Sequence, residues 1–353
     1  MVEAAGVSEY QGKVDSVVPD KPEGPIGLDV GTSNIVMAQN KGNKIVLTKQ
    51  LNAFFTIPQS KFTKQILIQN EITFFEHKKQ YFIIGDSAEN FANMFNANSK
   101  RTMEKGFLAL REDEGVAIIQ ALIKTLVQRP KKFGEIICFS VPGDAFDNED
   151  KASPLSGHES VIKMYLESLG YTPIAINEGL AVVMAELGDD NYTGIGISMG
   201  GGMCNICLSY MSVPVIQYSI QQGGDDIDER VGREVGLSAT KVKGIKEEGV
   251  DLSKLPKNKV ELAIQMYYTD LINQLVFSLE HVISSSNKIP KIADPVPVVI
   301  SGGTASPKGF REKFESAVQT IRLPFEISKI VIPQDPLSTT AKGALVMAVS
   351  ESI

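Results

Sequence analysis

Apolar and polar residues along the chain alternate between the two-residue period of strands and the longer period of amphipathic helices. A short apolar run at 26–30 ends in a Gly-Thr-Ser-Asn turn, and strand-like runs follow at 35–38 and 45–47. The same order of signals returns between residues 194 and 220, where three strands are expected around a Gly-Gly-Gly turn. Two meanders that each open on a glycine-rich turn indicate an internal duplication.

Each meander is followed by segments in which helix and strand signals alternate. The expected helices are 115–128, 159–169, 226–235 and 260–284, and the expected single strands are 135–141 and 297–300. Two segments of weaker regularity, about 50–98 and about 236–268, are predicted to be inserted subdomains. This alternation predicts an α/β fold whose strand ends bring the glycine-rich turns to one place.

Length and charge narrow the class of protein. The chain has 353 residues, of which 43% are hydrophobic and 22% are charged. A single core rarely grows to this size, so we expect two lobes with a cleft between them. The net charge of -7 provides no positive field that would attract nucleic acid or an anionic membrane. We therefore expect no direct nucleic-acid partner and regard membrane contact as an unfavoured alternative.

The N-terminal segment and the cysteines favour a cytoplasmic location. Residues 1–23 mix charged residues with Gly and Pro, lack the features of a secretory signal, and are expected to be a flexible tail. Three cysteines, Cys138, Cys204 and Cys207, lie in apolar surroundings and suit a reducing compartment. The pair Cys204 and Cys207 is spaced like a redox or zinc pair, but residues three apart on a strand point to opposite faces, which favours core packing.

Glycine-rich turns are the strongest candidates for chemistry. No Gly-x-x-x-x-Gly-Lys-Ser/Thr motif is present and no Gly-x-Gly-x-x-Gly opens a helix, which excludes P-loop and Rossmann sites. Asp29 ends a strand and is followed by the turn Gly31, Thr32, Ser33 and Asn34. Unpaired N–H groups and hydroxyls in such a turn can bind phosphate, and the carboxylate can hold hydrated Mg²⁺ beside it. A solvent-exposed β-turn is the alternative for any one such turn.

Two more turns strengthen the interpretation. They are Gly200, Gly201 and Gly202, which leave room for close approach of a ligand, and Gly302, Gly303 and Thr304, which follow an apolar strand. Three turns of this kind at strand ends of a duplicated chain favour a phosphate or nucleotide site.

At this point the sequence resembles the superfamily of actin, sugar kinases and 70-kDa heat-shock ATPases, and within it the prokaryotic actin homologues of the MreB and MamK type. The matching motifs, in order, are 26–34, 176–181, 196–205, 301–304 and 335–344, with 223–229 and 245–247 similar to a helix of the second lobe. The resemblance implies an actin-like (ribonuclease H-like) fold with two duplicated lobes around a nucleotide cleft, each lobe with an inserted subdomain. It implies lobe I at 24–187 plus 335–353 and lobe II at 188–334.

The resemblance also implies roles for individual residues. ATP or ADP would lie between the lobes with its phosphates between the first two turns, and Asp29 would position Mg²⁺ through water. Glu178 matches the position from which bacterial actins orient the attacking water, although a carboxylate that stabilises a helix N-terminus is an equal alternative. Lys246 and Glu247 would contact the ribose and adenine, and the turn at Thr304 the nucleoside.

One position departs from the family pattern. Ser198 stands where family members usually carry Asp, and a serine would give the metal only a weak oxygen contact. Loss of a charge-assisted contact of about 1.5–3 kcal/mol corresponds to one to two decades in metal affinity or rate. We therefore expect a slow ATPase, and expect Ser198→Asp to raise the rate.

The likeness to MreB and MamK implies assembly of the protein with itself into head-to-tail filaments that depend on nucleotide. Two alternatives remain open. A small-molecule kinase of the same superfamily would need a catalytic acid, for which Asp144 or Asp147 can be nominated. A scaffold of the same fold that binds nucleotide without hydrolysing it would fit Ser198. The histidines, His77, His158 and His281, are too far apart in sequence to suggest a metal site and are expected at surface or capping positions.

Overall fold

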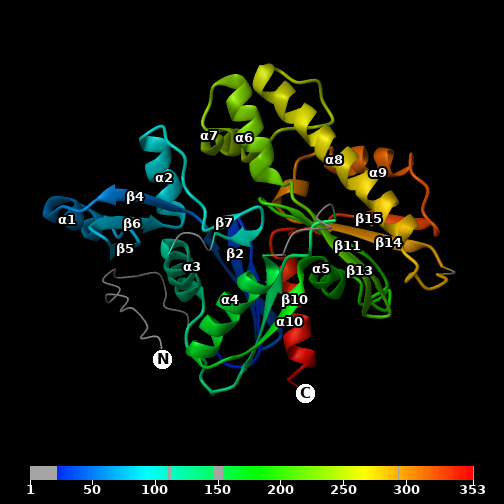
Figure 1. Cartoon of the computed structure of the whole chain (residues 1–353), viewed down its shortest axis with the longest axis horizontal. Helices are drawn as coiled ribbons and strands as arrows, with labels where there is room; N and C mark the ends of the chain where they lie inside the picture. The colour runs from blue at the N-terminus through cyan, green and yellow to red at the C-terminus, as the bar shows by residue number, and fades with distance from the viewer. Residues whose placement is uncertain (1–21, 110–112, 147–153, 293, 353) are drawn as a thin grey trace.

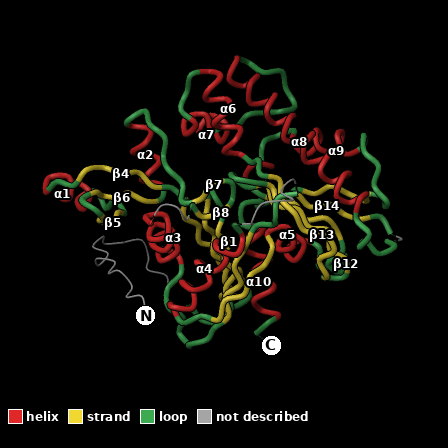
Figure 2. Tube along the Cα trace, viewed as in Figure 1, coloured by secondary structure: helices red, strands yellow, loops and turns green. Residues whose placement is uncertain are grey.

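The computed structural model describes residues 22–109, 113–146, 154–292 and 294–352. Two five-stranded sheets form the centres of two lobes (Figures 1 and 2). The first sheet has the order β10-β9-β1-β2-β3. Its strands are β1 (Ile26–Val30), β2 (Asn34–Lys41), β3 (Lys44–Leu51), β9 (Ile136–Val141) and β10 (Thr172–Asn177).

The second sheet repeats this topology. Its order is β13-β12-β11-β14-β15, with β11 (Gly194–Met199), β12 (Cys204–Tyr210), β13 (Val213–Ile220), β14 (Val296–Ser301) and β15 (Ile327–Val331). In both sheets three antiparallel strands form a meander, and two later strands add in parallel beside the first strand. The duplication expected from the sequence is confirmed.

Helices form where the apolar period predicts them. They are α3 (Asp113–Leu126) and α4 (Leu155–Leu169) with the first sheet, and α6 (Gly224–Val235) and α8 (Lys259–Ser285) with the second. The structure adds α9 (Phe310–Val318) to the second sheet, a helix that the sequence analysis did not predict. Gly170 ends α4 in the left-handed conformation at φ 102°, which costs a glycine little. The Asn258 side chain caps α8 by accepting from the N–H groups of Val260 and Glu261.

The first inserted segment is a small ordered unit with a core of its own. It contains the three-stranded sheet β4-β6-β5 and two helices. Its elements are β4 (Phe54–Pro58), α1 (Lys61–Gln69), β5 (Phe74–His77), β6 (Gln80–Ile84) and α2 (Asp86–Met94). The short hairpin of β7 (Met103–Glu104) and β8 (Phe107–Leu108) follows it. The second expected insert holds α7 (Ala239–Glu247), but its last ten residues are the first turns of α8.

Two helices, α5 (Glu178–Glu186) and α10 (Thr339–Ser350), lie between the sheets (Figure 1). They pack so closely that a Cβ at Gly343 would stand 1.7 Å from the carbonyl oxygen of Ala181. In the same way, a Cβ at Gly27 on β1 would stand 2.1 Å from the carbonyl oxygen of Ala341. Glycines at these contacts let α10 pack on α5 and on the first sheet. We use lobe I for the first sheet with its helices, the first insert and α10, and lobe II for the second sheet with α6 to α9.

The structure confirms core packing of the cysteine pair and contradicts the expected position of His158. Cys204 and Cys207 point to opposite sides of β12, with Cys204 in the lobe II core and Cys207 in the cluster against α5 and α10. The surface or capping position expected for His158 is wrong, because the side chain is fully buried on α4. Its Nδ1 accepts from the N–H of Leu108 at 3.2 Å, so the imidazole replaces a strand partner for that N–H group.

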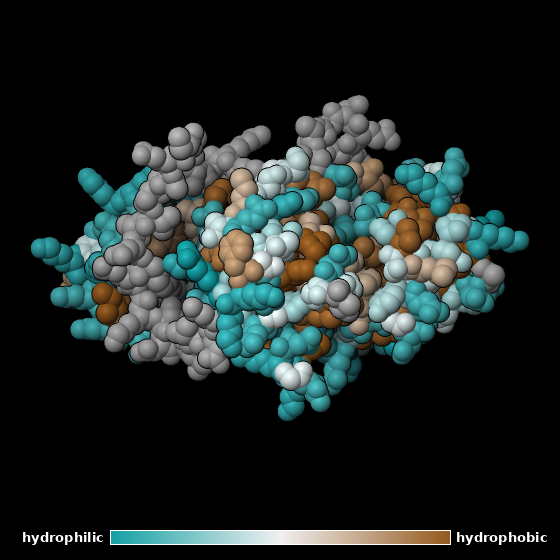
Figure 3. Space-filling model, turned by 90° about the horizontal axis from the view of Figure 1, so that it is seen from below, coloured by the Kyte–Doolittle hydropathy of each residue, from teal (hydrophilic) through white to brown (hydrophobic). Residues whose placement is uncertain are grey.

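Hydrophobic side chains on the face seen from below form separate groups among hydrophilic ones (Figure 3). Within the described ranges, no helix combines the length and the apolar character needed to cross a bilayer.

Candidate functional site

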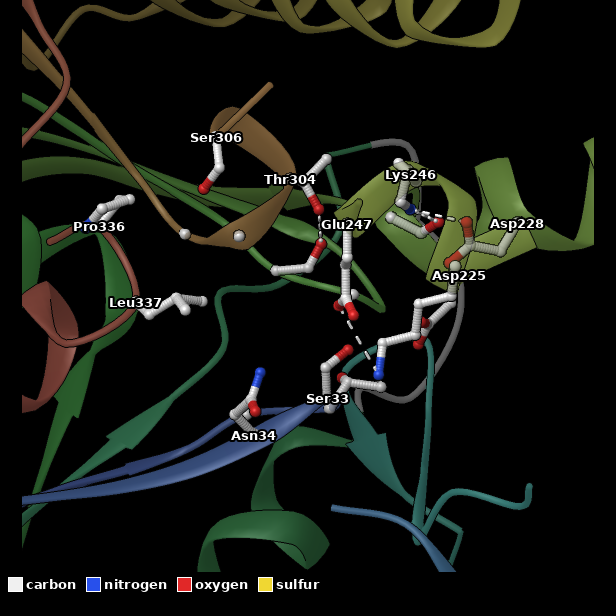
Figure 4. A pocket seen from close by; sticks show the side chains of 18 of the residues that line it. Ser33, Asn34, Asp225, Asp228, Lys246, Glu247, Thr304, Ser306, Pro336 and Leu337 are labelled. Atoms are coloured by element: carbon white, nitrogen blue, oxygen red, sulfur yellow. Dashed lines mark hydrogen bonds and ion pairs between the residues drawn. The ribbon is translucent and has the colours of Figure 1, made fainter. Parts of the chain in front are cut away.

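A cavity of about 740 Å³ lies between the lobes, and the three glycine-rich turns meet in its wall (Figure 4). The lining includes the sequence-predicted residues Asp29, Gly31, Thr32, Ser33, Asn34, Glu178, Ser198, Gly200, Gly201, Gly202, Lys246, Glu247, Gly302, Gly303 and Thr304. The fold therefore brings together residues that are separated by up to about 275 positions in the sequence.

The first turn presents a carboxylate held by a buried hydroxyl. The N–H of Gly31 donates to the carbonyl of Asn34 at 3.0 Å and closes the turn between β1 and β2. Ser140 on β9 accepts from the N–H of Val30 at 3.0 Å and donates its hydroxyl to Asp29 Oδ1 at 2.7 Å. Asp29 keeps part of its surface open to the cavity, yet burial of its carboxyl raises its pKa to about 6, against the opposing effect of the Ser140 hydrogen bond.

Glu178 is the first residue of α5, and Asn177 caps that helix by accepting from the N–H groups of Gly179 and Leu180. The Glu178 side chain is buried, and Ser198 donates its hydroxyl to Glu178 Oε2 at 2.9 Å. Burial, followed by the charge of Asp29, raises the pKa of Glu178 to about 8, while the hydrogen bond from Ser198 lowers it. Burial and the neighbouring charge therefore both favour the protonated form of the Glu178 carboxyl.

The pair of acids fits a hard cation. Asp29, Glu178 and Ser198 offer only oxygen atoms, which Mg²⁺ prefers. Like charge from Asp29 raises the pKa of Glu178, and a divalent cation would reverse that effect. No group of three or more His, Cys, Asp or Glu side chains with metal-site geometry occurs in the described part of the chain.

The second turn is made of glycine because there is no space for side chains. A Cβ at Gly201 would stand 2.1 Å from Ser33 Oγ, and a Cβ at Gly202 would stand 2.5 Å from the backbone nitrogen of Gly106. Neither glycine has a positive φ, so close approach rather than backbone conformation requires the residue type. The turn of lobe II thus packs directly on the first turn of lobe I.

The third turn is tied to the second. It forms the short helix η1 (Gly303–Ala305), and Thr304 donates its hydroxyl to the carbonyl of Gly200 at 2.7 Å. Gly302 has φ 96°, and a Cβ there would stand 2.2 Å from the carbonyl oxygen of Met199. The two glycine-rich turns of lobe II therefore form one rigid wall.

Of the two α7 residues Lys246 and Glu247, the lysine already contacts other groups of the protein. Lys246 Nζ lies 2.8 Å from Asp228 Oδ1 and donates to the carbonyl of Gly224 at 2.9 Å, and both side chains are almost fully buried (Figure 4). Burial raises the pKa of Asp228 to about 6 against the opposing effect of Lys246. Glu247 is 64% exposed in its side chain and lies 3.8 Å from Lys243. Its carboxylate is thus free to face a ligand in the cavity.

Several contributors were not assigned as site residues from the sequence. Asp228 supplies the partner of Lys246, and its place in the motif 223–229 was the available signal. Asn205 stands opposite Ser198 in the β11–β12 register. Its Oδ1 accepts from the N–H of Gly143 at 2.8 Å, and its amide lies beside Glu178 and lowers the pKa of that acid. Glu89 and Lys243 line the cavity from the two inserts, where no motif marked them.

Of the two candidate acids for a kinase, the one that the structure describes does not join the site. Asp144 is exposed and absent from the cavity wall, and its carbonyl accepts from the N–H of Ser219 at 2.7 Å. Asp147 lies outside the described residues.

Comparison with solved structures identifies the fold. A MamK double helical filament matches with a TM-score of 0.67 at 16% identity, covering 93% of this chain and 99% of that one. MreB 5 of Spiroplasma citri bound to AMPPNP also has a TM-score of 0.67, at 14% identity, covering 94% and 97%. The ethanolamine utilization protein EutJ from Carboxydothermus hydrogenoformans has a TM-score of 0.51 at 16% identity, covering 91% and 88%. These likenesses confirm the actin-like fold.

A search of curated proteins by sequence finds no match. A family model, described as Volactin, matches residues 25–348. Because this match spans nearly the whole chain, and because the duplicated lobes enclose the cavity just described, the protein is a member of the Volactin family with the actin-like fold.

Proposed function

We propose that the cavity binds ATP or ADP with Mg²⁺ and that the protein is a slow ATPase. The observation that carries this proposal is the convergence of three glycine-rich turns, the partly exposed Asp29 and the buried Glu178 on one cavity between duplicated lobes. Backbone N–H groups of the turns would hold the phosphates, and η1 and Glu247 would contact the nucleoside. MreB 5 structures bound to AMPPNP and to ADP support a nucleotide as the ligand of this fold.

Hydrolysis would depend on the protonation state of Glu178. The bound Mg²⁺ would supply positive charge beside the phosphates. Glu178 must lose its proton to orient or accept from an attacking water, and its pKa of about 8 opposes this. Positive charge near Asp29 would favour the ionised form of Glu178, the form that can orient an attacking water. With Ser198 in place of an acid, the remaining charge of the protein at the metal is small, which supports slow turnover.

We further propose that the protein assembles with itself into head-to-tail filaments in the cytoplasm when nucleotide is bound. The matched MamK structure is a double helical filament, and another MamK structure is a non-polymerising mutant bound to AMPPNP. A head-to-tail contact joins two different surfaces, so it continues along a filament without closing. We propose no direct nucleic-acid partner and no membrane contact, in keeping with the net charge of -7.

Binding, turnover and assembly can be separated in one set of experiments. Calorimetry with ATP and Mg²⁺ measures binding, phosphate release measures turnover, and sedimentation with and without ATP measures assembly. We expect wild type to bind ATP, release phosphate slowly and pellet with ATP. Glu178→Ala should still bind and pellet but release no phosphate, whereas Glu186→Ala, an exposed acid of the same helix, should resemble wild type. Absence of nucleotide binding by the folded protein would refute the proposal.

A scaffold that binds nucleotide without hydrolysing it is the second candidate. The observation in its favour is the hydrogen bond that the Ser198 hydroxyl donates to the buried Glu178 carboxyl, whose pKa is raised by burial. Such a protein would bind ATP in calorimetry but release no phosphate even in wild type. A kinase would stay in the supernatant and turn over only with its acceptor.

A further inference from the structure

The lobes touch at the mouth of the cavity, on the side opposite the α5–α10 crossing. There α2 of lobe I faces α7 of lobe II, and both lie in the upper part of Figure 1. Lys243 Nζ of α7 lies 2.5 Å from Glu89 Oε1 of α2. This is a direct ion pair between the two inserted segments.

A second cation strengthens the contact from the side of lobe I. Arg101 Nη2 lies 3.4 Å from the same Glu89 oxygen and 3.9 Å from Asp225 Oδ1 of lobe II. The side chains of Lys243, Arg101 and Glu89 are 11%, 16% and 20% exposed. A charged contact shielded from water to this degree is stronger and less screened by salt than a surface ion pair.

Two hydrogen bonds lie beside the ion pair. The N–H of Ser99 donates to Thr240 Oγ1 at 3.3 Å, and the N–H of Thr240 donates to Asn98 Oδ1 at 3.4 Å. Thr240 is the second residue of α7 and is buried by this contact. The inserts therefore meet along one turn of α7 rather than at a single pair of atoms.

The position of the Lys243–Glu89 ion pair affects how a ligand can leave the cavity. Glu89, Lys243 and Asp225 all line the cavity, so the ion pair stands in its wall at the mouth. The close α5–α10 crossing at Gly343 restricts sliding of the lobes on the other side and leaves rotation as the means of opening. Separation of the lobes at the mouth must break the contacts of Glu89 with Lys243.

We propose that Glu89, Arg101, Lys243 and Thr240 form a latch that holds the lobes closed and sets the rate at which nucleotide leaves the cavity. The predicted effect on the rate of nucleotide release rests on the proposed nucleotide binding. The predicted closure of the lobes by the latch does not depend on nucleotide and applies to the ligand-free protein. Glu89, Lys243 and Thr240 belong to the two inserts and Arg101 follows the first of them, so the latch regulates the site without contacting the reacting atoms.

The test measures dissociation of a fluorescent ATP analogue from the full chain by stopped flow. Lys243→Met keeps the length of the side chain but removes its charge, and we expect release about tenfold faster than in wild type, because loss of one partner of a shielded pair acts on dissociation. Lys243→Arg should stay near wild type. The double variant Glu89→Gln with Lys243→Met should release no faster than the faster single variant, because the two residues act as one contact.

Arg311→Ala provides the matched control, because it removes the exposed Arg311–Glu315 pair of α9, which is absent from the cavity lining. Small-angle scattering of the ligand-free protein supplies an independent readout, with a larger radius of gyration expected for Lys243→Met than for wild type or Arg311→Ala. If no variant binds nucleotide, the proposed function fails and scattering alone decides on the latch. Unchanged scattering together with release within twofold of wild type, in a folded Lys243→Met variant, overturns it.

Discussion

Single residues in the cavity are arranged around an excess of negative charge. Asp29 and Glu178 have raised pKa values because both are buried, and the charge of Asp29 adds to the shift at Glu178. Two hydroxyls, from Ser140 and Ser198, donate to these acids and partly offset the cost of burial. The chain thus places acids where a cation and phosphates would meet, and it stabilises them with neutral donors.

Ser198→Asp tests the effect of restoring a third acid. We expect phosphate release to rise about tenfold or more, since the added carboxylate strengthens the metal contact by about 1.5–3 kcal/mol. Without Mg²⁺ the same change should lower the free energy of unfolding by about 1–2 kcal/mol, because the new charge lies beside Glu178. Phosphate release and thermal melts with and without Mg²⁺ check both parts. An unchanged or lower rate in a folded variant would contradict the first.

His158 makes stability depend on pH. Burial lowers its pKa from 6.5 to about 4, so the unfolded chain takes up a proton before the folded one does. This contribution to stability is present above pH 6.5 and is lost as the pH falls toward 4, by about 3 kcal/mol at most. His158→Asn keeps an acceptor for the N–H of Leu108 and should flatten the pH dependence of urea unfolding between pH 7 and 4.5. The exposed His281→Asn should leave the wild-type slope; equal slopes in all three proteins would refute the argument.

At the scale of elements, the two meanders and helices α3, α4, α6 and α8 were predictable because their apolar periods are regular and glycines mark their ends, whereas α9, β15 and the elements of the first insert were not predicted. The close approach of other atoms to the turn at 200–202 was predictable, since only glycine lacks the Cβ that would block it. The burial of His158 was not, because its partner, the N–H of Leu108, is 50 positions away. The pairing of Lys243 with Glu89 was likewise hidden, since it joins two inserts 154 positions apart and no local pattern records such a contact.

The crossing of α5 and α10 gives a prediction for elements. Gly343→Ala should lower the free energy of unfolding by about 2 kcal/mol or more, because its methyl group would overlap the backbone of Ala181. Gly244→Ala on α7 is the matched change, since a Cβ there meets no atom within 4 Å. It should raise helix stability by about 0.5–1 kcal/mol. Denaturant unfolding of both variants measures the difference, and equal effects would argue against the tight crossing.

At the scale of the whole molecule, the lobes are joined by the α5–α10 crossing below the cavity and by the latch at its mouth. A ligand that contacts turns from both lobes adds a third connection and stabilises the closed form. Binding at one hundred times the dissociation constant adds about 2.7 kcal/mol to the free energy of unfolding. For a chain of this size the midpoint of thermal unfolding should rise by roughly 4 °C.

Scanning calorimetry with ATP and Mg²⁺ measures this shift. Removal of Mg²⁺ by EDTA should reduce it, because the repulsion between the phosphates and the two acids returns. Asp29→Asn should bind with a smaller dependence on Mg²⁺ than wild type. The same shift with and without EDTA in wild type would show that the acids hold no cation.

The packing of α10 on β1 has a consequence for biosynthesis. Helix α10 covers the sheet of lobe I from the far end of the chain, with Ala341 against Gly27. Lobe II, in contrast, is formed by one continuous stretch of sequence. A nascent chain can therefore complete lobe II while lobe I still exposes the apolar side of its sheet, which α10 covers only after lobe II has left the ribosome. Translation pauses or early termination near residue 338 would leave an intact second lobe attached to an aggregation-prone first one.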